Sequence, residues 1–238
     1  MKVIKEITEA LQMLSIEEKK AFFPRFFKTG KGEYGEGDLF LGVTVPDQRS
    51  IAKVYWNKIS LNELESLLQS KFHEHRATAL FILVLKFEKS KLIEERKMFV
   101  DFYLKNKAYI NNWDLVDLSC YKILGKYCLE INDSSILFDL AKETEMWSKR
   151  MAIVGSMLHI KNNQFQITLD LALYNLEHPH DLMHKANGWL LRELGKKNEY
   201  LLLSFLKTYY SKIPRTTLRY AIEKLDEDLR KDVLKGTF

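Results

Sequence analysis

The chain has 238 residues, of which 46% are hydrophobic and 29% are charged, and its formal net charge is +5. These values fit one folded domain or one short array of repeats, and they exclude a disordered chain. No apolar run approaches the roughly 18–20 residues of a membrane-spanning helix, and the N-terminal residues lack the apolar core of a secretory signal. Cys120 and Cys128 fit neither a disulfide framework nor a CxxC site, so we expect two buried thiols in a cytoplasmic protein.

Apolar residues recur with the 3.6-residue period of an α-helix along most of the chain, and two-residue alternation is nearly absent. The pattern predicts opening helices over residues 2–13, 16–28 and 46–58. Helix pairs follow at 61–70 with 73–88, 91–106 with 114–130, 134–143 with 147–161, 164–177 with 181–196, and 199–211 with 215–224, before a last helix at 226–235. Turn and capping residues, such as Asn132–Ser134 and Pro214, separate the helices.

The second helices of these pairs begin near residues 73, 114, 147, 181 and 215. Regular intervals of this length are typical of stacked two-helix repeats, although the repeats are not alike in sequence. We therefore predict an all-α solenoid of HEAT-like antiparallel helix pairs, forming a single domain over residues 1–238.

One segment interrupts the helical pattern. Residues 28–38 contain four of the ten glycines of the chain, and an apolar stretch, 39–45, follows. Glycine disfavours a helix here, so we predict a loop insertion or a small hairpin near residues 28–43. The GxxxxGK[ST] spacing of a nucleotide-binding loop is missing. A mobile loop that touches a nucleic-acid groove through Lys28 and Lys31 is the preferred interpretation.

Trp113 and Asp117 are four residues apart and would share one face of a helix. An aromatic face and a carboxylate suit a cationic, ring-shaped partner. Arg150 and Trp189 follow at intervals similar to the repeat length, so all four side chains could converge on one concave surface. The alternative is a core tryptophan with an aspartate that caps a helix.

A net excess of basic residues lies between Trp147 and Arg219, in the second half of the chain. Between Trp147 and Arg219 there are eleven basic and five acidic residues. A basic surface near the aromatic and acidic residues would favour a phosphate backbone, whereas scattered lysines on solvated helix faces are the alternative. The candidate DNA-binding residues are Lys149, Lys185, Arg192, Lys196, Arg215 and Arg219.

Histidines cluster at positions 178, 180 and 184, and a second group includes His73 and His75. His180 and His184 have the spacing of zinc ligands on a helix, but no cysteine and no HExxH motif accompanies them. We interpret both groups as residues that cap and flank helix starts, and we expect neither a metal nor a cofactor.

Several segments, in the same order along the chain, resemble the AlkD-like DNA alkylation repair family. They are Phe40-Leu-Gly-Val43, Pro46-Asp-Gln-Arg49, Ile110 to Asp117, Trp147 to Val154, Lys185 to Gly195, and Pro214 to Lys224. The likeness extends from about residue 14 to residue 235.

The resemblance implies an all-α HEAT-like solenoid whose concave, basic surface holds duplex DNA. Active members of the family are DNA glycosylases of base excision repair that remove positively charged N-alkylated bases such as 3-methyladenine and 7-methylguanine. Trp113 and Trp189 would then contact the deoxyribose of the lesion, Asp117 would be the catalytic carboxylate, and Arg150 would assist near the lesion's backbone. Tyr34 or Phe26 would supply a further aromatic. Family members are thought to act without inserting the base into a tight pocket.

The glycine-rich insertion is absent from the best-known active relatives, and some relatives with an added N-terminal hairpin bind branched DNA with little or no excision. The competing functions are therefore a structure-specific DNA-binding protein of the same fold and a HEAT-like scaffold that binds an acidic protein. We expect a monomer in the bacterial cytosol, with the nucleoid, that binds duplex DNA and no membrane.

Overall fold

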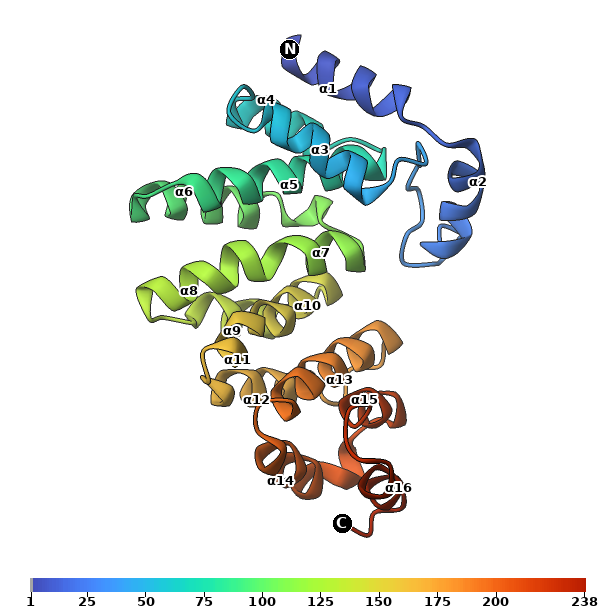
Figure 1. The fold of residues 1–238 in the computed structure, drawn as a ribbon, viewed down its shortest axis with the longest axis vertical. Helices are drawn as coiled ribbons and strands as arrows, with labels where there is room; N and C mark the ends of the chain where they lie inside the picture. Colours follow the sequence, from blue (N-terminus) through green and yellow to red (C-terminus); the bar gives the residue numbers. More distant parts are fainter. Residues whose placement is uncertain (1) are drawn as a thin grey trace. The chain divides into compact units, whose positions relative to one another are not determined.

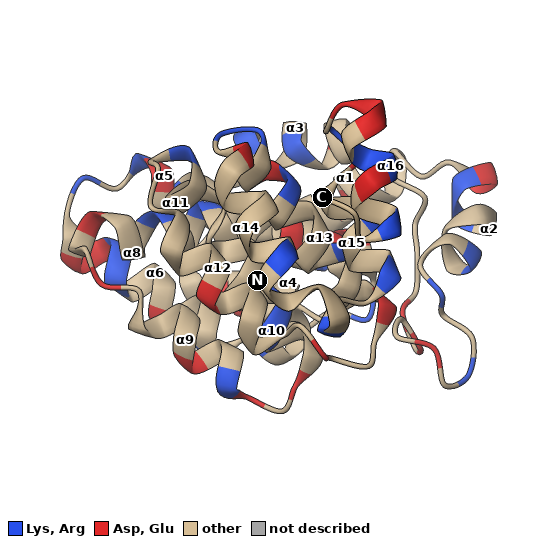
Figure 2. Cartoon of the chain, turned by 90° about the horizontal axis from the view of Figure 1, so that it is seen from below, with Lys and Arg blue, Asp and Glu red and all other residues tan. Residues whose placement is uncertain are grey.

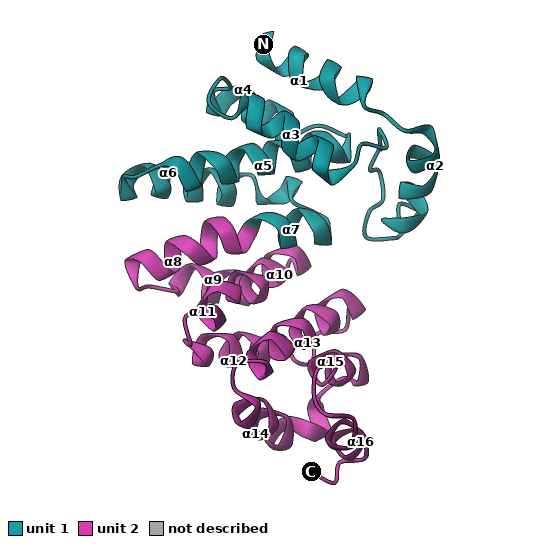
Figure 3. Ribbon diagram, viewed as in Figure 1, with its two compact units in different colours: residues 1–119 teal, residues 120–238 magenta. Residues whose placement is uncertain are grey.

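The computed structural model describes residues 2–238 and contains, within that range, helices and no β-strand (Figure 1). The predicted all-α fold of repeated helix pairs is confirmed. The chain divides into two compact units, one extending to Ser119 and the other comprising Cys120–Phe238 (Figure 3). The single domain predicted over the whole chain stays a prediction.

The first unit is built around one buried helix. Its elements are α1 (Lys2–Met13), α2 (Glu17–Phe26), α3 (Val45–Tyr55), α4 (Leu61–Leu68), α5 (His73–Lys89), α6 (Ile93–Lys105), the short 3-10 turn η1 (Lys107–Tyr109) and α7 (Trp113–Cys120). Most of α5 is buried, and α1, α3, α4 and α6 pack against it. The polar first turn of α5 is buried as well, and its side chains build the site described below.

The helix starts in this unit are defined by capping residues. The Thr44 side chain accepts the backbone N–H of Asp47 at the start of α3, where Pro46 occupies the first turn. Ser60 and Glu63 form a reciprocal capping box at the start of α4. Such caps satisfy backbone groups that a helix end leaves without partners. They fix where α3 and α4 begin, and both helices pack against α5.

The glycine-rich segment forms a series of turns. The backbone N–H groups of Gly30 and Gly32 donate to the carboxylates of Glu33 and Glu36, each at 2.8 Å. Gly32 and Gly37 adopt positive φ angles, which suit glycine. Within the described residues the only strand-like pairing is one isolated bridge between Leu39 and Phe72. The loop expected near residues 28–43 is therefore present, and the hairpin is not.

The second unit continues from α7 with the π-helical turn η2. Its elements are η2 (Tyr121–Gly125), α8 (Lys126–Ile131), α9 (Ser135–Lys142), α10 (Met146–Gly155), α11 (Met157–Lys161), α12 (Phe165–Tyr174), α13 (Asp181–Gly195), α14 (Glu199–Tyr209), η3 (Tyr210–Lys212), α15 (Arg215–Ala221) and α16 (Glu227–Lys235). The strongest packing joins α13 to α15 and α10 to α9. No described helix in either unit is long and apolar enough to cross a membrane.

Candidate functional site

A cavity of about 390 Å³ lies in the first unit, between α2, the start of α3, the first turn of α5 and α7. We call it the aromatic cavity. The side chains that line it are Phe22, Phe23, Phe26, Phe27, Val43, Val45, Gln48, His73, Glu74, Trp113, Asp114, Asp117 and Leu118.

Aromatic rings form much of the wall. The ring of Phe27 is nearly parallel to that of Trp113, with a centroid distance of 5.6 Å and an interplanar angle of 22°. Phe26 meets Trp113 edge-on at 5.9 Å. Behind them, Phe40 stacks on both Phe27 (5.1 Å) and the His73 imidazole (5.0 Å). The rings hold one another in place and present flat apolar faces and edges to the cavity.

Trp113 and Asp117 both line this cavity from α7, one helical turn apart. Trp113 is the first residue of the helix, and its backbone N–H donates to Asn112 Oδ1 at 2.8 Å. The acid in the first turn of α7 is Asp114, so Asp117 is not the capping residue of this helix. Both Trp113 and Asp117 are half-buried.

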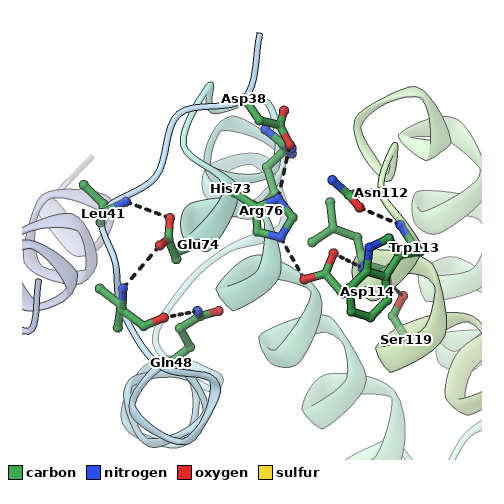
Figure 4. A network of polar contacts seen from close by, with 12 residues as sticks. Asp38, Leu41, Gln48, His73, Glu74, Arg76, Asn112, Trp113, Asp114 and Ser119 are labelled. Atoms are coloured by element: carbon green, nitrogen blue, oxygen red, sulfur yellow. Dashed lines mark hydrogen bonds and ion pairs between the residues drawn. The ribbon is translucent and has the colours of Figure 1, made fainter. Parts of the chain in front are cut away.

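A chain of buried charges lies beside Trp113 (Figure 4). His73 Nε2 donates to Asp114 Oδ2 at 2.8 Å, and His73 Nδ1 lies 3.2 Å from Asp38 Oδ2. Arg76 donates to the same Asp38 oxygen at 2.7 Å. Two cations and two anions thus alternate along Arg76, Asp38, His73 and Asp114. They link the end of the glycine-rich segment to the start of α7.

Burial opposes protonation of His73, but the charge and hydrogen bond of Asp114 and the hydrogen bond of Asp38 outweigh it and raise the pKa of His73 to about 9. The imidazole is therefore a cation at neutral pH. Burial raises the pKa of Asp38. The His73 hydrogen bond and the Arg76 charge together lower it by more, so the pKa of Asp38 is below its ordinary value.

The carboxylate of Glu74 organises the loop before α3. It is 1% exposed and accepts the backbone N–H groups of Leu41, Gly42 and Val43 at 3.0, 2.8 and 3.2 Å. Gly42 has a φ of +84°, and a Cβ there would lie 2.3 Å from the carbonyl oxygen of Ile16. Only glycine fits this position, which brings the loop close to the start of α2.

Gln48 completes the inner wall from α3. It is 3% exposed, and its Nε2 donates to the carbonyl oxygen of Val43 at 2.8 Å. Its Oε1 has no hydrogen-bond partner among residues 2–238. Figure 4 shows this oxygen on the side of the amide away from Val43.

Arg150 and Trp189 belong to the second unit. Arg150 lies in α10, is 5% exposed, and donates from a terminal nitrogen to the carbonyl oxygen of Leu182 at 2.5 Å. Trp189 is half-buried on α13. The expected convergence of Arg150 and Trp189 with Trp113 and Asp117 stays a prediction.

The candidate DNA-binding residues lie on α10, α13 and α15 of the second unit, except Lys196, which directly follows α13. Several of them pair with acids. Figure 2 shows basic and acidic residues interleaved on its helices. Lys185 pairs with Asp181 at 2.7 Å, Arg192 pairs with Glu223, and Lys196 pairs with Glu193. Lys149 and Arg215 donate to backbone carbonyls of Ala141 (3.1 Å) and Leu234 (3.0 Å), and Arg219 is exposed. Phosphate binding by this set stays a prediction.

The histidine cluster of the second unit has the expected capping geometry. His180 Nδ1 accepts the backbone N–H of Leu182 at the start of α13, and His184 Nε2 donates to the carbonyl oxygen of His178 at 2.5 Å. No group of three potential metal-binding side chains is present within residues 2–238. Burial raises the pKa of the Cys128 thiol to about 12, which makes it a poor nucleophile.

The sequence assigns no site role to several residues of the cavity. Phe23 and Phe27 lie outside the segments of the family resemblance, whereas Phe40 and Gln48 lie within them without a predicted role. For His73 the sequence predicts only a place at a helix start. The run Phe22-Phe23-Pro-Arg-Phe26-Phe27 is an available signal, because four phenylalanines in six residues exceed what one buried helix face needs. Of the two candidates for an additional aromatic, Phe26 lines the cavity and Tyr34 is not among the described lining residues.

The packed helix pairs and an aromatic cavity lined by the carboxylates of Glu74, Asp114 and Asp117 define a helical-repeat protein with a site large enough for a small ligand. The chain belongs to the DNA alkylation repair enzyme family, whose model matches residues 7–225. This membership gives it a role in DNA repair. A similar solved structure is a predicted DNA alkylation repair enzyme from Enterococcus faecalis, with a TM-score of 0.70 and 18% identity, covering 90% of this chain and 97% of that one. At this identity the likeness shows the fold. A comparison with curated proteins gave no match.

Proposed function

We propose that the protein is a DNA glycosylase that removes positively charged N-alkylated bases, such as 3-methyladenine and 7-methylguanine, from duplex DNA. The observation that carries the proposal is the placement of Asp117 beside Trp113 at the aromatic cavity. No lysine or arginine is among the described residues that line this cavity. Aromatic rings and carboxylates arranged in this way stabilise positive charge.

The chemistry requires stabilisation of the sugar more than activation of the base. An N-alkylated purine is already a cation and leaves without further protonation. As the N-glycosidic bond breaks, positive charge develops on the deoxyribose, as in other glycoside hydrolyses. Asp117 stabilises this charge and orients a water molecule for attack at C1′. Water is the only co-reactant, so the reaction needs no cofactor.

The remaining residues have roles in binding the sugar and the backbone. Trp113 and Trp189 shelter the deoxyribose and interact with its positive character through their indole faces. Arg150 assists near the lesion's backbone. The basic residues of α13 and α15 bind phosphates, which fixes the protein on the duplex without reading sequence. The protein would act on DNA as a monomer in the cytoplasm and would not bind a membrane.

The test is the release of 7-methylguanine from methylated duplex DNA by the purified protein. Asp117→Asn keeps the side chain's shape but removes its charge, and excision should fall at least about a hundredfold. Duplex affinity and folding should stay close to wild type. Asp101→Asn is the matched control, because Asp101 is an exposed acid of the same unit that pairs with Lys97 on the surface. This control should excise at the wild-type rate.

The opposite result is equally clear. If wild-type protein binds duplex or branched DNA tightly but releases no base, the glycosylase proposal is wrong. The protein would then be a structure-specific DNA-binding member of the family. Binding that resists salt and that an acidic protein competes for would indicate a protein scaffold instead.

A further inference from the structure

We propose that the histidine cluster at the start of α13 binds a phosphate group, and that duplex DNA supplies this group. The cluster, which we call the histidine site, comprises His178 and His180 before α13 and the basic residues Lys149, Arg150 and Lys185. Only the choice of DNA as the source of the phosphate rests on the proposed function. The site lies within the second unit and contains none of the described residues that line the aromatic cavity.

Two backbone hydrogen bonds fix which nitrogen of each imidazole carries the proton. The N–H of His180 donates to His178 Nδ1, and the N–H of Leu182 donates to His180 Nδ1, both at 3.1 Å. A ring nitrogen that accepts a hydrogen bond has no proton, so in each neutral ring the proton is on Nε2. Both side chains are half-buried. Each ring therefore has an N–H donor on the side away from the backbone group that it caps.

Three cations lie around these rings. Arg150 of α10 is 5% exposed and donates to a backbone carbonyl oxygen in the first turn of α13 at 2.5 Å, which joins the two helices at the site. Burial lowers the pKa of His178, and the charge of Lys149 lowers it further. Burial also lowers the pKa of His180, and the charges of Arg150 and Lys185 add to this effect. Both rings are therefore neutral at neutral pH, as their accepting Nδ1 atoms require.

Asp181 is the main acid at the site. It pairs with Lys185 at 2.7 Å, and its side chain also hydrogen-bonds Thr216 of α15. A further contact from α15 is uncharged, because Thr217 donates to the carbonyl oxygen of His184 at 3.1 Å. His184 in turn donates to a backbone carbonyl oxygen of the loop before α13. Three cations thus face one main acid, and the positive end of the 15-residue helix α13 adds to the attraction for an anion.

A phosphate group matches this combination of cations and directed N–H donors. Its oxygens accept several hydrogen bonds at once, and lysine and arginine compensate its charge. A neutral imidazole adds a directed hydrogen bond without adding charge. Contacts of this kind position a protein on the DNA backbone and carry no sequence information. The histidines of the loop before α13 would therefore both cap the helix and hold a backbone phosphate.

Asparagine separates these two roles. Its Oδ1 lies at about the same place as Nδ1 of histidine and can accept the same backbone N–H, so His180→Asn keeps the cap. The shorter side chain has no group at the position of Nε2, so the second donor is lost. We expect the double variant His178→Asn/His180→Asn to bind duplex DNA about tenfold more weakly than wild type, because two neutral hydrogen bonds are removed. Its free energy of unfolding should stay close to wild type.

The salt dependence of binding identifies the kind of contact. Because the rings are neutral, the double variant should lose affinity without changing the slope of log K against log salt concentration. A slope reduced by about 0.9 for each histidine would show that the rings bind as cations, and the assignment as neutral donors would be wrong. Fluorescence anisotropy measures the affinity and the slope, and urea denaturation measures the stability.

Asn198→Ser is the control. It replaces one capping residue by another at the start of α14, in the same unit, where the Asn198 side chain accepts the backbone N–H of Leu201. This variant should change neither duplex affinity nor stability. If it weakened DNA binding as much as the histidine variant does, the loss would follow from any change of a helix cap, and the histidine site would be wrong.

Inorganic phosphate is the second probe, because it has the same chemistry without DNA. Phosphate added to the wild-type protein should shift the NMR signals of the ring nitrogens of His178 and His180. If it does so while the double variant binds duplex DNA like wild type, the site binds a small anion and the assignment to DNA is wrong. If the signals do not shift and duplex affinity is unchanged, the histidines only cap α13 and the inference is overturned.

Failure of this inference is distinguishable from failure of the proposed function. If the wild-type protein releases 7-methylguanine and the double variant binds duplex DNA as tightly as wild type, the histidine site does not hold DNA and the glycosylase stands. If the double variant loses duplex affinity as expected but the wild-type protein releases no base, the phosphate site stands and the glycosylase proposal is wrong.

Discussion

His73 lies between two carboxylates, and this arrangement makes the stability of the first unit depend on pH. Its pKa is about 9 in the folded protein, above the ordinary value of 6.5. Below pH 6.5 the imidazole is protonated whether the chain is folded or not, so the full stabilisation is present there. As the pH rises from 6.5 through 9, only the folded state retains the proton, and the stabilisation is lost.

His75 has the opposite effect in a lower range. Burial, followed by the nearby charge of Arg76, lowers its pKa from 6.5 to about 4. Between pH 4 and 6.5 the unfolded chain binds this proton and the folded chain does not, so stability rises with pH. The effects of the two histidines therefore occur in different pH ranges and can be measured separately.

We predict that the free energy of unfolding of the wild-type protein falls by on the order of 2 kcal/mol between pH 6.5 and 9. His73→Gln should remove most of this slope, because glutamine has no proton to lose. His178→Gln should preserve it, since burial lowers the pKa of His178. Urea denaturation at a series of pH values measures both. An unchanged slope in His73→Gln would show that another group titrates.

Among single residues, the sequence could identify site residues that lie close together along the chain. Trp113 and Asp117 are one helical turn apart, and helical spacing is enough to place them on one face. Phe27 and Phe40 come from segments flanking the glycine-rich loop, and no local period relates them to Trp113. Likewise, Asp38 is separated by 35 positions from His73, its partner. Such contacts depend on how the loop folds back, which periodicity does not encode.

At the scale of elements, helix periodicity was enough to predict the helices but not their interruptions. The helix predicted over 114–130 contains the π-helical turn η2, and the one predicted over 147–161 is divided at Ser156 between α10 and α11. Gly125 of η2 lies so close to α10 that a Cβ there would be 2.1 Å from the carbonyl oxygen of Gly155. Two glycines thus permit a close helix approach that an apolar pattern cannot show.

A similar approach joins α13 to α15. A Cβ on Gly188 would lie 2.6 Å from the carbonyl oxygen of Thr217 and 2.4 Å from Tyr220 Cβ. Neither atom can move without a shift of α15, so Gly188→Ala should destabilise the protein by about 1–3 kcal/mol, despite the better helix propensity of alanine. Because Trp189 is the next residue, base release should fall as well if Trp189 contacts the sugar.

Gly195→Ala, in the same helix, is the matched control. Its Cβ would meet Leu202 Cδ2 at 2.4 Å, the far end of a flexible side chain that can rotate away. We expect a change in unfolding free energy of less than about 1 kcal/mol. Chemical denaturation of both variants makes the comparison, and equal effects would contradict the close contact between α13 and α15.

At the scale of the whole molecule, the repeat spacing in the sequence predicts the stack of helix pairs, because each pair must bury its apolar face against the next. The division at Ser119–Cys120 falls within the helical run of residues 113–131, where the sequence has no proline, no loop and no change in composition. Boundaries along a chain are normally recognised by a proline, a loop or a change in composition, and none of these marks the point where the two compact units meet. The sequence therefore gives no sign of the division.

The local excess of basic residues between Trp147 and Arg219 lies in the second unit, and the acidic aromatic cavity lies in the first. In the proposed function the second unit supplies phosphate contacts, whose contribution depends on salt. Lys185 allows a controlled test of these phosphate contacts. It forms an ion pair with Asp181 at 2.7 Å, and Lys97 in the first unit forms a similar ion pair with Asp101 at 2.6 Å. Both are exposed pairs of the i, i+4 type, which contribute little to stability.

Lys185→Gln should therefore weaken binding to any duplex several-fold, independently of sequence, and reduce the slope of log K against log salt concentration by about 0.9. Lys97→Gln should change neither quantity, although it removes the same charge from a similar pair. Fluorescence anisotropy with two unrelated duplexes over a series of salt concentrations measures both slopes. Equal losses for the two variants would mean that binding responds only to net charge, and the assignment of phosphate contacts to the second unit would then be wrong.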